Sequence, residues 1–171
     1  MPVEVAGVRV PVGRAAESAQ TVCAEYADEA LYHHSARPYF FGAAWARARG
    51  LDSDFDRELA GLGWPAERRD RTAELIVLHM RDDVAPEVDL ESRLLQVGTS
   101  ADVSGTGLEA FAPSFVDTLV GVYPRQGFAH SFVRLFKDQA ERKPGCAAAE
   151  LVAGEWAERT SSHPLDKCRR V

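Results

Sequence analysis

Residues 31–42 of the chain read Leu-Tyr-His-His-Ser-Ala-Arg-Pro-Tyr-Phe-Phe-Gly, and the pattern predicts a helix from Leu31 to Arg49 that Gly50 ends. Pro38 removes a backbone donor and clashes with the preceding turn, so we expect the helix to kink there or a new helix to begin. Four residues of the stretch recur at helical spacing and would share one apolar face: Leu31, His34, Phe41 and Trp45. One histidine is therefore expected to point inward.

The chain on both sides of this stretch also predicts helices. The pattern predicts one helix before the stretch, over residues 15–30. After the stretch it predicts helices over residues 54–62, 65–80, 90–103, 115–122, 127–142 and 147–158. Asp89 is expected to cap the helix that begins at Leu90. The alternating valines from Val3 to Val12 predict an extended arm or a short strand, and the tail from Thr160 is expected to fray. The predicted fold class is all-α.

Length and composition fit one globular domain over residues 1–171, with an extended arm over 1–13 and a frayed tail over 160–171. The net charge of −6 argues against a nucleic-acid partner. Three cysteines without a CxxC pair, and a start without a signal-peptide pattern, favour a cytoplasmic location. The apolar run Leu75–Met80 is too short to cross a membrane.

Three ionisable residues on three predicted helices fall on apolar faces: His34, His79 and Asp102. A single inward histidine is usually a satisfied core residue, and the aspartate could cap a neighbouring helix. Helical bundles, however, build metal sites from side chains on facing helices, and histidine with aspartate suits a metal that activates water. Spacing alone leaves a metal site and three separate core contacts equally open.

The segment Leu31–Gly42 resembles the first signature of HD-domain proteins, a superfamily of metal-dependent phosphohydrolases, and in particular of their cyanamide-hydratase-like branch. That branch typically reads Asn-His-Ser-x-Arg-Val-Tyr-x-Phe-Gly. Four later segments are similar to family segments in the same order: Ala73–His79, Leu94–Asp102, Val122–Arg125 with Phe128, and Lys143-Pro144. The resemblance extends from about Val3 to Pro144 and implies an HD-domain-like helical bundle.

The resemblance also implies a ligand set. The family holds its metal with an early histidine, an adjacent His-Asp pair and a late aspartate. The early histidine corresponds to His34 and the late aspartate to Asp102, while His79 resembles a pocket histidine that helps with metal or substrate. Arg37 matches the arginine of the first signature, so Arg37 and His79 are expected in a ligand pocket. The implied cofactor is a divalent metal, Zn²⁺, Fe²⁺ or Mn²⁺, held by this incomplete set.

The chain departs from the family at the residues that matter most. No His-Asp dipeptide occurs in it, and the central helix that should carry one between Leu51 and Ala73 is missing from the sequence. Pro38 is a second departure, because the family usually has a β-branched residue there. Loss of a central helix would expose apolar faces of its neighbours, so we expect a homodimer that covers them.

Three functions stay open on this resemblance. The favoured one is a degenerate HD-like protein that binds a small molecule or a partner without catalysis. The alternative is an active metal-dependent hydrolase or hydratase, whose metal-bound water attacks a phosphoester or a nitrile-like carbon. The third is a shortened chain whose lost segment abolished activity.

Overall fold

The computed structural model describes residues 4–10, 14–51, 71, 74–75 and 84–167. Helices dominate this part of the chain, and its strands form one two-stranded hairpin, which confirms the all-α prediction. The strands are β1 (Glu4–Val5) and β2 (Val8–Arg9). The helices are α1 (Arg14–Tyr26), α2 (Glu29–Ala48), α5 (Leu90–Val103), the 3-10 helix η1 (Leu108–Ala110), α6 (Pro113–Val122), α7 (Phe128–Arg142), α8 (Ala147–Ala153), α9 (Trp156–Ser161) and α10 (Pro164–Lys167).

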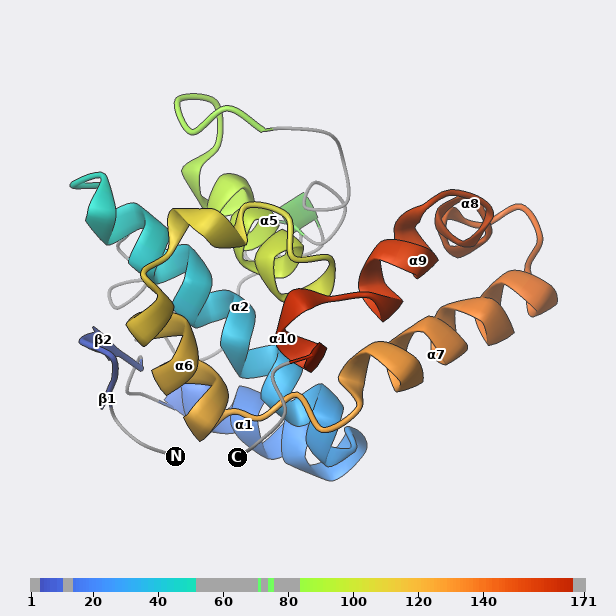
Figure 1. Cartoon of the computed structure of the whole chain (residues 1–171), viewed down its shortest axis with the longest axis horizontal. Coiled ribbons are helices and arrows are strands. Elements are labelled where there is room, and N and C mark those ends of the chain that lie inside the picture. The colour runs from blue at the N-terminus through green and yellow to red at the C-terminus, as the bar shows by residue number, and fades with distance from the viewer. Residues whose placement is uncertain (1–3, 11–13, 52–70, 72–73, 76–83, 168–171) are drawn as a thin grey trace.

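Helices α2 and α5 pack along each other in the middle of the molecule, and α7, α8 and α9 project to one side (Figure 1). None of the described helices is both long and apolar enough to span a bilayer. The predicted helices at 54–62 and 65–80 lie outside the described residues, except for Arg71, Glu74 and Leu75, which are helical.

The extended arm predicted near the N-terminus is a hairpin over the described residues 4–10. Ala6 and Gly7 form its turn with φ of 49° and 79°, and Val5 pairs with Val8 across it. Because residues paired directly across two antiparallel strands point to the same face, both valines enter the core. The Tyr39 hydroxyl donates to the Arg9 carbonyl at 2.8 Å and ties the arm to α2.

Helix α2 passes through Pro38, so of the two expected alternatives the new helix is wrong, and the kink stays a prediction. The helix starts where Asp28 accepts a hydrogen bond from the Leu31 amide at 2.8 Å, and Gly50 follows its end with φ of 64°, as predicted. Pro38 is buried against α5. Packing along the whole length of α2 thus outweighs the local cost of the missing donor.

Two glycines bring the backbones of α2 and α5 close together. A Cβ placed on Gly98 of α5 would lie 2.0 Å from the Pro38 carbonyl oxygen. A Cβ on Gly42 of α2 would lie 2.7 Å from the Leu94 carbonyl oxygen. Such distances are far inside van der Waals contact, so only glycine permits this helix pair.

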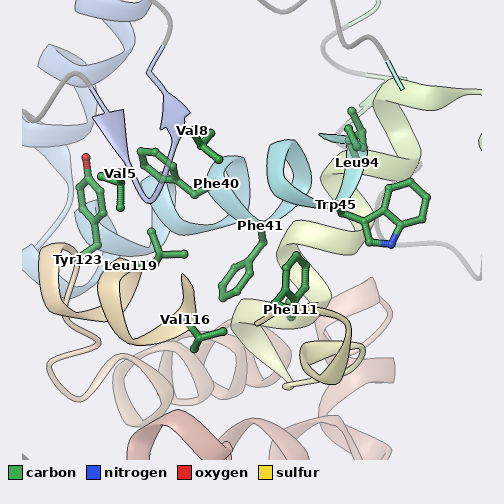
Figure 2. Packing of buried hydrophobic residues seen from close by; sticks show 12 residues of the cluster. Val5, Val8, Phe40, Phe41, Trp45, Leu94, Phe111, Val116, Leu119 and Tyr123 are labelled. Atoms are coloured by element: carbon green, nitrogen blue, oxygen red, sulfur yellow. The ribbon is translucent and has the colours of Figure 1, made fainter. Parts of the chain in front are cut away.

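The hydrophobic core surrounds α2 and joins it to α5, α6 and the hairpin (Figure 2). The labelled core residues are Val5, Val8, Phe40, Phe41, Trp45, Leu94, Phe111, Val116, Leu119 and Tyr123. Phe41 is fully buried, and its ring meets the ring of Phe111 edge to face, with 4.9 Å between the centroids. Aromatic packing therefore fixes the segment after α5 against α2.

The C-terminal predictions needed two corrections. The single helix expected over 147–158 is two helices, α8 and α9, because Gly154 ends the first. The tail expected to fray from residue 160 is ordered to residue 167: Thr160 and His163 are fully buried, and α10 follows. Residues 168–171 lie outside the described part.

Asp89 caps α5 as predicted and also holds Arg71. Its carboxylate accepts from the Ser92 amide at 3.0 Å and from Arg71 at 2.7 Å. The hydrogen bond from Arg71 lowers the pKa of Asp89 to about 2. Because this pKa is below that of the unfolded chain, the stabilisation is complete above about pH 4 and is lost as the pH falls toward 2.

We expect Asp89→Ala to lower the free energy of unfolding by about 1–2 kcal/mol at pH 7, measured by urea denaturation. Asp28→Ala is the matched control, because Asp28 caps α2 without an arginine partner among the described residues. The Asp89 variant should lose more stability than the Asp28 variant, and the difference should shrink as the pH falls from 4 to 2. Equal losses at every pH would contradict the role assigned to Arg71.

Candidate functional site

A buried carboxylate, Asp102 in the last turn of α5, accepts hydrogen bonds from three side chains, two on α2 and one in the turn between α6 and α7. Its Oδ2 lies 2.6 Å from Nδ1 of His34. Its Oδ1 accepts from Nε of Arg37 at 2.6 Å and from Nη1 of Arg125 at 3.0 Å. Asp102 and Arg37 are fully buried, whereas the His34 side chain is 17% exposed. The cluster therefore reaches the surface at the histidine.

Local structure explains how these side chains meet. His34 and Arg37 are three residues apart on α2, about one helical turn, and therefore share a face. Asp102 lies on the face of α5 that Leu94 and Gly98 turn toward α2. Arg125 comes from the turn between α6 and α7, in which Gln126 has a positive φ of 47°.

Electrostatics keep Asp102 ionised. Burial by itself would raise the pKa of its carboxyl, but the hydrogen bond from His34 and the charge and hydrogen bond of Arg37 outweigh it. The pKa is lowered to about 2. At neutral pH the site is thus an aspartate anion between two guanidinium cations.

The two arginines are held by further acceptors. Arg37 Nη1 donates to the backbone carbonyls of Tyr123 and Pro124, at 3.2 and 3.1 Å. Arg125 forms two bonds with the carboxylate of Asp166 in α10, at 2.7 and 3.1 Å, and also donates to the Asp102 carbonyl. Two aspartates thus balance two arginines, and the cluster ties α2, α5, the α6–α7 turn and α10 together.

The His34 ring is held in a single orientation. It stacks on the ring of Phe128, the first residue of α7, with centroids 4.4 Å apart, and Phe132 lies next to it at 5.3 Å. Since the Asp102 carboxylate is ionised, Nδ1 of His34 carries the proton and donates it. Within the described part of the chain, its Nε2 has no hydrogen-bond partner.

A second histidine, His163, closes the site from the C-terminal side. Its Nε2 donates to the Ala101 carbonyl at 3.0 Å, and its Nδ1 accepts from the Leu165 amide at 3.1 Å. Both nitrogens are used by the neutral ring. Burial lowers the pKa of His163, and the charge of Arg125 lowers it further. This neutral histidine fixes the start of α10, which carries Asp166.

We expect His163 to make the stability of the protein depend on pH. The unfolded chain takes up a proton as the pH falls through about 6.5, while the folded ring stays neutral until a lower pH. Its contribution is therefore complete above about pH 6.5 and lost as the pH falls toward the lowered folded pKa. Urea denaturation between pH 7.5 and 5 should show a shallower pH dependence for His163→Gln than for the wild type.

His163→Gln should also cost about 1–3 kcal/mol at pH 7, because a buried carbonyl and a buried amide lose a well-placed partner. His130→Gln is the control, since His130 is exposed on α7 and should leave the slope unchanged. Parallel pH profiles for the wild type and the His163 variant would refute this role.

The structure brings together three of the four residues that the sequence analysis selected. His34, Arg37 and Asp102 are in direct contact or share one partner, and His79 lies outside the described residues. Asp166 and His163 were not predicted as site residues, because the tail that carries them was expected to fray. Arg125 was named only as part of a segment that resembles the family, because an arginine after Tyr-Pro in a turn gives no local sign of a buried carboxylate partner.

The donor set in the described part of the chain does not fit a metal shared by His34 and Asp102. Both oxygens of Asp102 already accept hydrogen bonds, and guanidinium groups stand beside Oδ1, where a cation would bind. No group of three or more histidine, cysteine, aspartate or glutamate side chains among the described residues is arranged to hold a metal ion. His34 Nε2 is left as a single nitrogen ligand.

Comparison with known proteins adds no relative. No family model matches the chain, and neither the curated proteins nor the solved structures yield a significant match. The contacts around Asp102 therefore carry the functional argument by themselves.

Proposed function

We propose that this chain is a degenerate HD-domain-like protein that binds a small molecule at the His34 edge of the Asp102 cluster without a catalytic metal. The observation that carries the proposal is the saturation of the Asp102 carboxylate by His34, Arg37 and Arg125. An aspartate held in this way serves to orient its neighbours. The groups left for a ligand are the outer nitrogen of His34 and the half-buried ring of Phe132 beside it.

A metal-dependent hydrolase or hydratase is the second candidate. It is favoured by one observation: His34 and Asp102, the two residues that the resemblance implies as metal ligands, lie 2.6 Å apart although 68 positions separate them in the chain. For this function the arginines would have to release the carboxylate.

Metal analysis separates the two candidates. The protein is purified from medium supplemented with zinc, iron and manganese, and its metal content and thermal unfolding are measured with and without EDTA. The proposal predicts substoichiometric metal and a melting temperature that EDTA leaves unchanged. Stoichiometric metal that is lost in His34→Ala would overturn it in favour of the hydrolase.

Binding itself is read at His34. The imidazole ¹H–¹³C resonances are assigned with the His34→Gln variant and followed during titration with a fragment library of uncharged and anionic small molecules. We expect saturable shifts of the His34 resonance for a subset of fragments, with the exposed His130 as the control. A His34 resonance that no fragment moves beyond His130 would count against a ligand site.

A further inference from the structure

The outer nitrogen of His34 has a use beyond ligand binding. The ring donates a hydrogen bond from Nδ1–H to a buried carboxylate, which makes Nε2 the nitrogen with the lone pair. The His34 side chain is 17% exposed, whereas Asp102, which accepts from its Nδ1, is fully buried. A carboxylate-oriented imidazole is the arrangement that activates histidine in acid–base and nucleophilic chemistry.

The neighbouring histidine supplies an internal comparison. His33 lies next to His34 on α2, and its Nδ1 is held by the backbone carbonyl of Pro124 at 3.0 Å. Both rings are half-buried and both have Nδ1 engaged. They differ in the acceptor, which is a neutral carbonyl for His33 and an anionic carboxylate for His34. A positive charge that develops on the ring is stabilised by the anion only at His34.

Two features hold the Asp102–His34 pair ready for this chemistry. The other oxygen of Asp102 is held by Arg37 and Arg125, so the carboxylate cannot rotate away from the histidine. The His34 ring rests on Phe128 and next to Phe132, which hold its plane.

We propose that His34 is a metal-independent nucleophile that accepts an acyl group at Nε2 from activated esters and anhydrides, with Asp102 as the positioning residue. The Nε2 lone pair forms a bond to the carbonyl carbon, and the carbon–oxygen bond to the leaving group breaks, so that an alkoxide or carboxylate leaves with the electron pair. The cationic acyl-imidazole is stabilised through Nδ1–H by Asp102. Water then attacks the acyl carbon and the nitrogen–carbon bond breaks, its electron pair returning to Nε2 as the lone pair of the neutral ring. The two protons of that water leave to solvent, one on attack and one as the product acid ionises, and an alkoxide leaving group takes up one proton from solvent to become the alcohol.

Site-resolved acylation tests the proposal on the intact protein. The chain is treated with limiting diethyl pyrocarbonate in EDTA, and carbethoxylation at each histidine is followed over time by peptide mass spectrometry. We expect His34 to react at least about tenfold faster than His33. The exposed His130 corrects for simple access, and the buried His163, with both nitrogens bonded, should react slowest. A rate at His34 no greater than that at His33 overturns the proposal.

A turnover assay gives an independent result. The release of p-nitrophenolate from p-nitrophenyl acetate, again in EDTA, should fall by about tenfold or more in His34→Gln and stay unchanged in His130→Gln. If His34→Gln retains the wild-type rate, the nucleophile lies elsewhere and the proposal fails. Neither assay depends on metal content or on fragment binding. A failure of the acylation proposal is therefore distinguishable from a failure of the proposed function.

Discussion

Asp102→Asn is expected to lower the free energy of unfolding by about 3–5 kcal/mol at pH 7, because it leaves two buried guanidinium groups without their shared anion. Arg37 and Arg125 are almost completely buried, with side chains 0% and 3% exposed, so water cannot replace the lost charge. Urea denaturation followed by circular dichroism measures the loss.

Asp117→Asn is the matched control for this experiment. Asp117 lies exposed on α6 and has no charged partner among the described residues, so the same change of charge should shift stability by less than about 0.5 kcal/mol. If Asp102→Asn costs no more than Asp117→Asn, the cluster around Asp102 is not a determinant of the fold.

Gly98→Ala is expected to destabilise the protein by about 1–3 kcal/mol or more, since the new methyl group would lie 2.0 Å from the Pro38 carbonyl oxygen. The clash is with backbone on a helix that carries much of the core, so a side-chain rotation cannot relieve it. The clash can be relieved only if α2 and α5 move apart. This movement would also lengthen the hydrogen bonds from His34 and Arg37 to Asp102. Thermal and urea denaturation report the cost.

Gly121→Ala provides a control of opposite sign. Gly121 lies exposed on α6, and a Cβ there would meet nothing within 4 Å. Because alanine is a better helix former than glycine, this variant should raise the free energy of unfolding by up to about 1 kcal/mol. Destabilisation by both alanines, to the same extent, would mean that the close approach at Gly98 carries no special cost.

Sequence reasoning worked where a residue's role depends on its near neighbours in the chain. The cap at Asp89, the helix end at Gly50 and the inward position of Asp102 follow from spacing along one helix, and each is present. It failed in part at Pro38, where the new helix, one of the two expected alternatives, does not form because α2 packs against α5. It failed again over 160–167, where a polar sequence folds because His163 and Asp166 find partners elsewhere.

By itself, the sequence determined the helical class and placed His34 and Asp102 on inward faces, because helical periodicity depends only on residues three or four positions apart. The tertiary structure alone decided what those side chains do. Arg125 lies 23 positions after Asp102, and Asp166, which holds Arg125, lies a further 41 positions along the chain. A buried carboxylate takes whichever donors the packed helices bring to it, and here two guanidinium groups and an imidazole reached it together.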